Sequence, residues 1–342
     1  MTKQSNCKSE ETAILGAVIN WNGWRDTVRC VESLMEQNGP SFQLVICDNG
    51  SSDDSVRQLS DWLASQAVFS AQFHTIPGPD IHATRFNGAF STTLKTVYLL
   101  RLPKNMGYAG AINQCIDWGR QALMARHFWL LNNDVKADPQ ALAQLVEATR
   151  FAPDIGLCGS VLLDWDHPES VQAIGGVYRR YLAVGQHMQV LPAASDKHGR
   201  AFFDIDYPVG ASLFVTQKYL DAVGLMDDAY FLYYEEMDWA ERGRRLGFRP
   251  AVALGSLVQH KEGASTGSHG GVRNKSILSE HYGVINRLRI TQKFWPQYLP
   301  VVWCSLWLVT LDRLIHGEWD RAGLVLKLMF SPWLWILRRK HD

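Results

Sequence analysis

Residues 231–239 read FLYYEEMDW, so that Glu235 and Glu236 directly follow four bulky side chains and Asp238 lies two places further on. A carboxylate beside an apolar surface can accept a proton from a hydroxyl group, which is the role of a general base. Acids at the start of a helix are also stabilised by the helix dipole, and the stretch MDWAERGRRLG predicts a helix. On these residues alone, a catalytic and a helix-capping interpretation both stay open.

A second group of polar side chains, Asn132-Asn133-Asp134, directly follows the apolar run HFWLL. A single carboxylate, helped by an amide and a histidine, can hold Mg²⁺ or Mn²⁺ against a diphosphate. The triplet also fits a polar turn before a helix that has Asp138 as its N-cap and Pro139 at its first position. His260 follows an apolar run as well, and such a histidine taken alone is more often structural.

The elements that must position these residues form an alternating pattern. Four short apolar runs predict buried strands, at 14–20, 42–47, 95–102 and 127–134, and a helical stretch follows each of them. This alternation predicts an α/β fold with a mostly parallel, Rossmann-like sheet and helices on both faces. Ligands of such sheets bind outside the carboxyl ends of the strands. The polar residues at those ends are Asn20, Asp48, Asn49, Asn105 and the triplet Asn132-Asn133-Asp134.

Two common nucleotide-binding loops are absent from the sequence. The first predicted strand is followed by NWNGWRD rather than G-x-G-x-x-G, and no G-x-x-x-x-G-K-[ST] occurs. Neither a Rossmann dehydrogenase nor a P-loop enzyme is therefore supported. The net charge of +0, from 34 basic and 34 acidic residues, likewise indicates no nucleic-acid partner.

Three further features concern the cell compartment and the limits of the predicted domain. Residues 1–12 are polar and lack the apolar stretch of a signal peptide, so we expect a disordered N-terminus and a cytoplasmic protein. The six cysteines are scattered without a C-x-x-C pair, which fits a reducing compartment. Residues 66–92 have mixed polarity with Pro and Gly and are expected to form an inserted surface loop.

Taken together, these segments resemble the family 2 glycosyltransferases, particularly their rhamnosyltransferase-like branch. The resemblance implies the A-type glycosyltransferase fold in a catalytic domain over 13–294, a divalent cation (Mg²⁺ or Mn²⁺) and inversion at the anomeric carbon. The matching stretches occur in the family's order over residues 14–266. They are VINWNGWRDTVRCVESL, LVICDNGSSDDS, NMGYAGAIN, WLLNNDV, YPVGASLFVTQKYLDAVGLMDDAYFLYYEEMDWAERGRRLGF and VQHKEGAS.

The resemblance also implies roles in donor binding for individual residues. Asp48 is implied to read the base of the donor, with Asn20 in the same pocket. The loop NMGYAGAIN is similar to the family's N-x-G-F-A-G-G-x-N stretch, whose glycines allow the backbone to pass close to the donor. The residues implied in nucleotide-sugar binding are Asn20, Asp48, Asn49, Asn105, Gly107, Asn113, Asn132 and Asn133.

The same comparison implies the metal ligands and the base. Asn132-Asn133-Asp134 falls on the family's D-x-D position with asparagine in the first place, which leaves Asp134 as the strong metal ligand and His260 as its implied partner. FLYYEEMDW resembles the family's F-x-Y-x-E-D-x-D, and Glu236 stands at the catalytic-base position in place of an aspartate. Supporting or acceptor-side roles are implied for Glu235, Asp238 and Trp239.

Tryptophan is concentrated towards the C-terminus, where six of the 13 tryptophans follow residue 294. The apolar run 299–311 is shorter than the roughly 20 residues that a helix needs to span a bilayer. Apolar runs, tryptophans and the basic stretch Arg338-Arg339-Lys340 predict amphipathic helices over 295–342 that lie on a membrane surface. The alternative is that these helices pack on the main domain or form a homodimer interface.

We therefore expect an inverting, metal-dependent glycosyltransferase of cell-surface polysaccharide synthesis, for example of lipopolysaccharide. It would move a sugar, with L-rhamnose as the first candidate, from a nucleotide diphosphate donor to a glycan or polyprenyl-linked acceptor. Its place would be the cytoplasmic face of the inner membrane. The first alternative is a catalytically silent, nucleotide-sugar-binding assembly subunit. The second is a sugar nucleotidyltransferase, which would need a glycine- and basic-rich loop that ILGAVINWNGW lacks.

Overall fold

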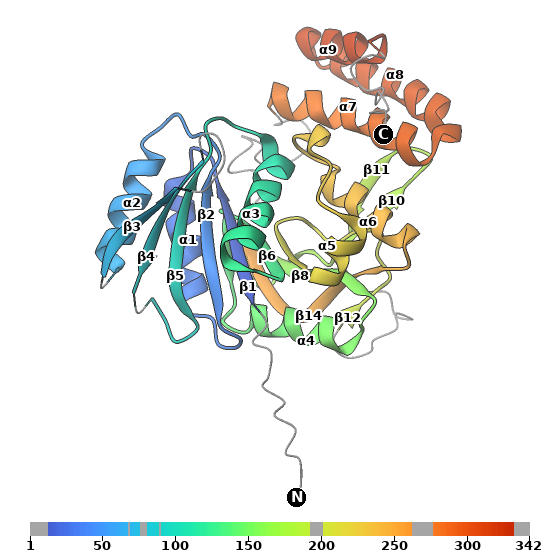
Figure 1. Cartoon of the computed structure of the whole chain (residues 1–342). Helices are drawn as coiled ribbons and strands as arrows, with labels where there is room; N and C mark the ends of the chain where they lie inside the picture. Colours follow the sequence, from blue (N-terminus) through green and yellow to red (C-terminus); the bar gives the residue numbers. More distant parts are fainter. Residues whose placement is uncertain are drawn as a thin grey trace, which may run out of the picture.

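The computed structural model of the chain describes residues 13–67, 69–75, 81–88, 90–191, 201–261 and 276–331. Its strands are β1 (Ile14–Asn20), β2 (Phe42–Asp48), β3 (Phe69–Thr75), β4 (His82–Asn87), β5 (Leu94–Arg101), β6 (His127–Asn132), β7 (Val135–Ala137), β8 (Ile155–Asp164), β9 (Val171–Ala173), β10 (Gly176–Arg179), β11 (Val184–His187), β12 (Ala201–Phe202), β13 (Ser212–Val215) and β14 (Arg249–His260). One sheet runs in the order β12-β14-β8-β13-β6-β1-β2-β5-β4-β3, with β7 paired to β14 and β9 to β8, while β10 and β11 form a separate hairpin (Figure 1).

The centre of the sheet is parallel, as its continuous apolar strands predict. β1 pairs in parallel with both β2 and β6, and β2 pairs in parallel with β5. The register places Asn20 opposite Asp48 and Ile19 opposite Asn132, so the polar ends of three strands meet at one edge of the sheet. The expected strands at 14–20, 42–47, 95–102 and 127–134 are all present, within one or two residues of their predicted ends.

The second half of the sheet has a reversed strand in its middle. β13 runs antiparallel between β6 and β8, and β14 is parallel to β8. The far end of β14 also pairs with the short β7, which places His260 opposite Val135. This pairing brings a residue from late in the chain to the end of β6.

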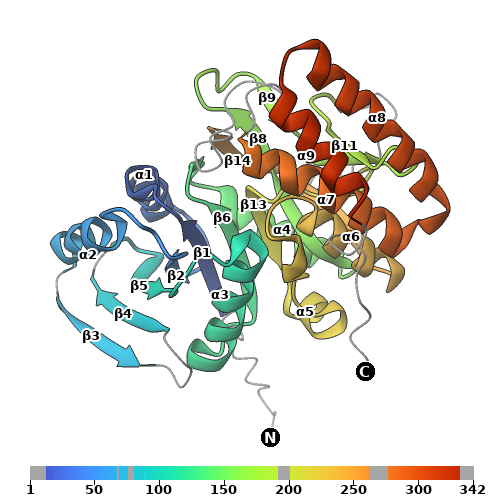
Figure 2. The ribbon, with the colours of Figure 1, turned by 90° about the horizontal axis from the view of Figure 1, so that it is seen from above.

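The helices lie in two layers, one on each face of the sheet (Figure 2). The layer of α1, α2 and α4 packs on one face, and that of α3, α5, α6 and α7 packs on the other, with α8 and α9 outside α7. The helices are α1 (Trp24–Met35), α2 (Ser55–Gln66), α3 (Gly107–Leu123), α4 (Ala141–Phe151), α5 (Gln217–Val223), α6 (Glu235–Arg245), α7 (Ile277–Phe294), α8 (Leu299–Ile315) and α9 (Trp319–Met329).

Residues 66–92 differ from the loop that was expected there. They contribute β3 and β4, which extend the sheet as antiparallel strands beyond β5. The buried side chains of β4 are Ala83 and Phe86, three positions apart rather than two, so no period-2 alternation marks the strand in the sequence. Pairing with β5, rather than a local pattern, makes this segment a strand.

Two other expectations about boundaries are corrected. α4 begins at Ala141 with Gln140 at its N-cap, so Asp138 and Pro139 precede the helix, and the Asp138 carboxylate accepts the N–H of Gln140 instead. The apolar C-terminal segment is also longer than the run 299–311, because a continuous helical stretch covers Pro296–Ile315.

This stretch of 20 residues is long and apolar enough to cross a membrane by length and composition alone. In the structure, however, α8 packs on both α7 and α9. Its buried Arg313 donates to Glu280 of α7 (2.7 Å), and Arg321 of α9 donates to the same carboxylate (2.6 Å). The predicted disorder of residues 1–12 and the basic stretch Arg338-Arg339-Lys340 lie outside the described residues.

Candidate active site

The ends of β1 and β2 are joined by a buried hydrogen-bond network. Asn20 is fully buried, its amide donates to the Asp48 carboxylate (2.8 Å), and its carbonyl accepts the hydroxyl of Thr27 (2.8 Å). Asp48 also accepts the main-chain N–H and the hydroxyl of Ser51. The network fixes the loop after β2, and the contact of Asp48 with a nucleotide base stays a prediction.

The next loop is fixed in the same way and comes close to the acidic motif. The Asn49 amide donates to the Asn105 side chain (3.1 Å) and accepts the N–H of Met106 (2.9 Å). Gly107 has a φ of +74°, and a Cβ added there would lie 2.4 Å from the carbonyl oxygen of Phe231. Only glycine allows this approach, so loop 105–107 supports the turn that precedes α6.

The turn before α6 holds three residues in the left-handed region, namely Phe231, Tyr233 and Tyr234, with φ of 59°, 68° and 74°. Such backbone is costly for bulky side chains and persists only where the surroundings determine it. Asn286 of α7 supplies that support. Its amide donates at 2.7–3.1 Å to three carbonyl groups of the turn, those of Tyr230, Leu232 and Tyr233.

The turn delivers Glu235 and Glu236 into the first turn of α6, which begins two residues earlier than expected. Glu235 is buried, whereas Glu236 is partly exposed. Burial raises the pKa of the Glu236 carboxyl to about 7. Burial, and then the charge of Glu236, raise the pKa of Glu235 well above its ordinary value. A helix N-terminus acting alone would stabilise the charged form and lower both values.

Asp238 and Trp239 lie beneath the turn and support it. Asp238 is fully buried, accepts the hydroxyl of Tyr230 (3.0 Å), and pairs with Arg242 (2.7 Å) and Lys293 (2.5 Å). The Trp239 indole is also fully buried and donates to a main-chain carbonyl. Of the two roles expected for these residues, supporting or acceptor-side, the burial of both side chains favours the supporting one.

The two predicted metal ligands lie together. The β7–β14 pairing places His260 Nε2 3.5 Å from Asp134 Oδ1. The other ring nitrogen, Nδ1, lies 2.8 Å from the side-chain oxygen of Gln172. Since that oxygen can only accept, Nδ1 carries a proton, and in the neutral ring the lone pair is then on Nε2, the nitrogen nearer to Asp134.

The chemistry of this pair fits a divalent cation. Within the part of the chain that the structure describes, no group of three or more His, Cys, Asp or Glu side chains gathers as a metal site. A Mg²⁺-type ion that is bound largely by substrate phosphates needs only one or two protein ligands. Asp134 and His260 provide such a partial set.

The remaining asparagines of the predicted site brace the structure. Asn133 donates to the hydroxyl of Thr27 (3.1 Å), and Asn113 exchanges two hydrogen bonds with the main chain of Met226. Asn132 is only partly buried, at the end of β6. Direct contacts of these residues with a donor stay predictions.

Tyr108 follows Gly107 at the start of α3 and is affected by the charges of the acidic residues. Its hydroxyl donates to the carbonyl of Gly210 (2.9 Å). Burial, together with the charges of Glu235, Glu236 and Asp134, raises its pKa well above the ordinary value. The charges of the acidic motif and of Asp134 thus act on the same phenol.

Three residues of this site were not predicted from the sequence: Gln172, Tyr108 and Asn286. Tyr108 lies in the loop NMGYAG and Asn286 in HYGVINRLRI, and both stretches are visible as motifs without indicating a role. Gln172 has no local signal, because it reaches His260 only through the pairing of β8 with β9 and β14.

Comparisons of sequence and of structure relate the chain to known glycosyltransferases. No family model matches the chain. The N-acetylglucosaminyl-diphospho-decaprenol L-rhamnosyltransferase of Mycobacterium tuberculosis, in two strains, is 27% identical over 202 residues. The match covers 53% of this chain and 65% of the relative, just under two thirds of its length.

Two solved structures share the fold at low sequence identity. GalNAc-T7 with UDP, GalNAc and Mn²⁺ has a TM-score of 0.58 and 12% identity over 85% of this chain and 49% of its own. The mannosyltransferase PcManGT from Pyrobaculum calidifontis with GDP-Man and Mn²⁺ has a TM-score of 0.52 and 11% identity over 95% and 88%. The A-type glycosyltransferase fold is thus confirmed, as is the resemblance to rhamnosyltransferase-like proteins.

Proposed function

We propose that this chain is a metal-dependent, inverting glycosyltransferase that acts on a lipid-linked glycan acceptor in cell-surface polysaccharide synthesis. The observation that carries the proposal is the position of Glu236. This partly exposed carboxyl has a pKa raised to about 7, and its charge acts on the same Tyr108 phenol as the charge of Asp134 does, the partner of His260. A single displacement at a sugar carbon needs a general base and, near it, a site that binds the leaving group.

Glu236 would act as the general base. A sugar hydroxyl is a poor nucleophile until its proton is removed, and a base with a pKa near the working pH removes it most effectively. The acceptor oxygen forms a bond to the anomeric carbon as the bond from that carbon to the donor's phosphate oxygen breaks. The proton passes to Glu236, the nucleotide diphosphate leaves with the bonding electrons, and the anomeric configuration inverts.

Asp134 and His260 would hold the divalent cation. When bound, the ion would supply positive charge that stabilises the leaving diphosphate. Gln172 fixes the tautomer of His260 in which Nε2 can act as a ligand, through the 2.8 Å contact at Nδ1. The neighbouring glycosyltransferases with Mn²⁺ and a nucleotide or nucleotide sugar support this choice of cofactor and donor class.

The acceptor and donor sugar are proposed from the curated relative, whose name joins L-rhamnose to a saccharide on a diphospho-lipid. A lipid-linked acceptor also fits the exposed apolar surface of α8, which includes Leu308, Leu311 and Ile315. We place the enzyme on the cytoplasmic face of the membrane, where nucleotide sugars are available.

A donor panel tests the proposal. The purified chain is incubated with nucleotide sugars, including an L-rhamnosyl nucleotide, with N-acetylglucosaminyl-diphospho-polyprenol and either Mn²⁺ or EDTA. We expect release of nucleoside diphosphate that requires the metal, and a glycosidic bond of inverted configuration by NMR. Nucleotide binding without consumption of any donor would instead establish the silent assembly subunit. Release of pyrophosphate from a nucleoside triphosphate and a sugar phosphate would establish the nucleotidyltransferase.

A further inference from the structure

One face of α7 contacts the turn that presents Glu236 along most of its length. The residues of this face are three or four positions apart, which places them in one row on a helix. They are Ser279, Tyr282, Asn286, Arg289 and Lys293. Each of them contacts a residue between 227 and 234, either its side chain or its carbonyl group. The shape of the turn therefore depends on where α7 lies.

The beginning of this row meets the strained part of the turn. The Tyr233 hydroxyl donates to Ser279 Oγ (3.2 Å), and the ring of Phe231 stacks on that of Tyr282, with centroids 4.7 Å apart and planes inclined by 16°. Both Phe231 and Tyr233 have positive φ, and such backbone persists only where its surroundings hold it. The first two turns of α7 must therefore stay in place if the catalytic turn is to keep its conformation.

Another face of the same helical turns is bound to the C-terminal helices. Glu280, the neighbour of Ser279, is buried, and each of its carboxylate oxygens accepts one guanidinium. Oε1 accepts from Arg313 of α8 (2.7 Å), and Oε2 accepts from Arg321 of α9 (2.6 Å). Charge-assisted hydrogen bonds of a buried carboxylate are stronger than those of an exposed ion pair. Glu280 therefore clamps the beginning of α7 to both C-terminal helices.

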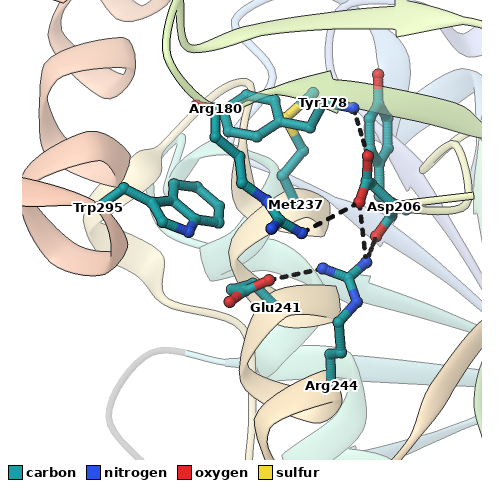
Figure 3. A pocket seen from close by; sticks show the side chains of 8 residues that line it. Tyr178, Arg180, Asp206, Met237, Glu241, Arg244 and Trp295 are labelled. Carbon is teal, nitrogen blue, oxygen red and sulfur yellow. Dashed lines mark hydrogen bonds and ion pairs between the residues drawn. The ribbon is translucent and has the colours of Figure 1, made fainter. Parts of the chain in front are cut away.

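The later turns of α6 are fixed by a different set of contacts. Arg244 pairs with Glu241 (2.6 Å) and with Asp206 (3.4 Å), and Arg180 reaches the same Asp206 at 3.6 Å (Figure 3). These ion pairs hold the body of the helix without Glu280. A displaced α7 would consequently act first on the turn before α6, where the proposed base is presented.

We propose that Glu280 is a positioning residue for the reaction, because its clamp on Arg313 and Arg321 holds the start of α7 against the turn that presents Glu236. The inference rests on the proposed function, in which Glu236 is the base. It gives α8 and α9 a task besides contact with lipid. These helices would take part in the geometry of the active site through α7, although they lie outside it.

Two cations of α9, Arg321 and Lys327, provide a matched test. Arg321 donates to Glu280, whereas Lys327 is exposed one and a half turns further along the helix. With an L-rhamnosyl nucleotide as donor and N-acetylglucosaminyl-diphospho-polyprenol as acceptor, Glu280→Gln should lower kcat roughly 10–100-fold, the scale of a misplaced catalytic group. Arg321→Ala removes one arm of the clamp and should have a smaller effect, Arg321→Lys should recover part of the loss, and Lys327→Ala should match the wild type.

The same variants should leave the affinity for nucleoside diphosphate and Mn²⁺ unchanged in calorimetric titration, because the proposed metal pair lies on other elements. The acid limb of kcat/KM should move to lower pH in Glu280→Gln and Arg321→Ala, since a relaxed turn exposes Glu236 and lowers its pKa toward the ordinary value. A variant that only loses stability would keep the limb of the wild type.

NMR makes the test independent of turnover. The ¹³C signal of the labelled Glu236 carboxyl, assigned by its loss in Glu236→Gln, reports the pKa of that group. This pKa should fall in Glu280→Gln and in Arg321→Ala but not in Lys327→Ala. A lower melting temperature with an unchanged pKa and an unchanged kcat would make Glu280 purely structural and overturn the inference. If the wild type consumes no donor, the proposed function fails, and the NMR titration still shows whether Glu280 controls the surroundings of Glu236.

Discussion

Glu235 and Glu236 are adjacent in sequence but differ in their exposure to solvent. Glu235 is buried, and its Oε2 is without a hydrogen-bond partner among the described residues, while Glu236 is partly exposed on the same helical turn. An acceptor hydroxyl can approach only the second carboxyl. The substitution Glu236→Gln keeps the shape of the side chain but removes its ability to accept a proton.

Glu236→Gln should therefore lower kcat by roughly 10²–10⁴-fold with little change in the donor's affinity, the usual scale for a positioned general base. Glu235→Gln is the control and should cost far less. Steady-state rates with saturating donor, together with calorimetric titration of the donor, separate the two effects. Loss of turnover in Glu235→Gln but not in Glu236→Gln would mean that the other carboxylate is the base.

The raised pKa of Glu236 predicts a pH profile. A base must be ionised, so kcat/KM should rise with pH through an apparent pKa of about 7 that belongs to the interacting Glu235 and Glu236 carboxyls together.

The free energy of unfolding should change with pH in the opposite direction. The folded pKa lies above the ordinary 4.5, so the native state binds more protons between about pH 4.5 and 7. The free energy of unfolding should fall as the pH rises across that window.

Urea denaturation at a series of pH values measures this second effect. Glu236→Gln should flatten the activity profile, because it removes the proposed base, and should lessen the pH dependence of stability, to which the buried Glu235 still contributes. A wild-type rate that is constant from pH 5 to 8 under conditions where chemistry limits turnover would contradict the assignment.

Substitution of Asp134 tests the second part of the proposal, the binding of a divalent cation. Asp134→Ala should abolish the gain in donor affinity that Mn²⁺ provides, and His260→Ala should weaken that gain less, because a carboxylate is the harder ligand. Calorimetric titration with nucleoside diphosphate, with and without the metal, gives the comparison. Asp138→Ala, at an exposed acid just beyond β7, serves as the control. Normal metal dependence in Asp134→Ala would remove it from the ligand set.

At the scale of elements, α7 supports the turn that presents Glu236, the proposed base. Asn286 donates to three carbonyls of a turn that contains three residues with positive φ, so it holds the backbone in a conformation that the side chains disfavour. Loop 105–107 supports the same turn from the other side through Gly107. The pH profile of activity can show whether Asn286 positions Glu236 or only stabilises the fold.

Asn286→Ala should relax the turn, lower kcat roughly 10–100-fold, and shift the acid limb of activity below pH 7, because a more exposed Glu236 returns toward its ordinary pKa. Asn286→Asp keeps the shape but lacks the amide donors, and it should behave like the alanine variant. Circular dichroism would test whether both variants are folded. A reduced melting temperature with an unchanged pH limb would mean that Asn286 is only structural.

At the scale of the whole molecule, the C-terminal helices α8 and α9 present an apolar surface while they remain packed on α7. Leu308 and Ile315 are each 71% exposed, and Leu311 is 53% exposed on the same face of α8. On the opposite face, Arg313 is buried against Glu280. Truncation after residue 294 would remove this packing and uncover the core, so substitutions on the exposed face are the cleaner test of membrane binding.

The triple variant Leu308→Ser, Leu311→Ser and Ile315→Ser should lower binding to lipid vesicles by at least tenfold, because each apolar side chain contributes about 1.5–3 kcal/mol when fully buried. Co-sedimentation with vesicles of bacterial lipid composition measures the change. A control triple variant changes Met124, Phe151 and Leu246 to Ser, which are also exposed but lie on other elements. Equal binding of both triple variants would contradict a membrane role for α8.

The sequence by itself determined the parallel half of the sheet and the residues at its carboxyl edge. Strands that are buried on both faces read as continuous apolar runs, and short-range spacing is enough to recognise them. The same local reading located the acidic motif at a helix start and Asp134 at a strand end. The family resemblance then assigned roles to these residues, and the fold it implied is the one observed.

Only the tertiary structure decided which of these residues meet. His260 reaches Asp134 because β14 pairs with β7, Gln172 reaches His260 across neighbouring strands, and Asn286 reaches the turn because α7 packs on it. The strands within 66–92 likewise exist through pairing with β5. Periodicity encodes which face of an element is buried, but it does not encode the partner that buries it. The exposure that separates Glu236 from Glu235, and the burial that raises the pKa of both carboxyls, depend on those partners.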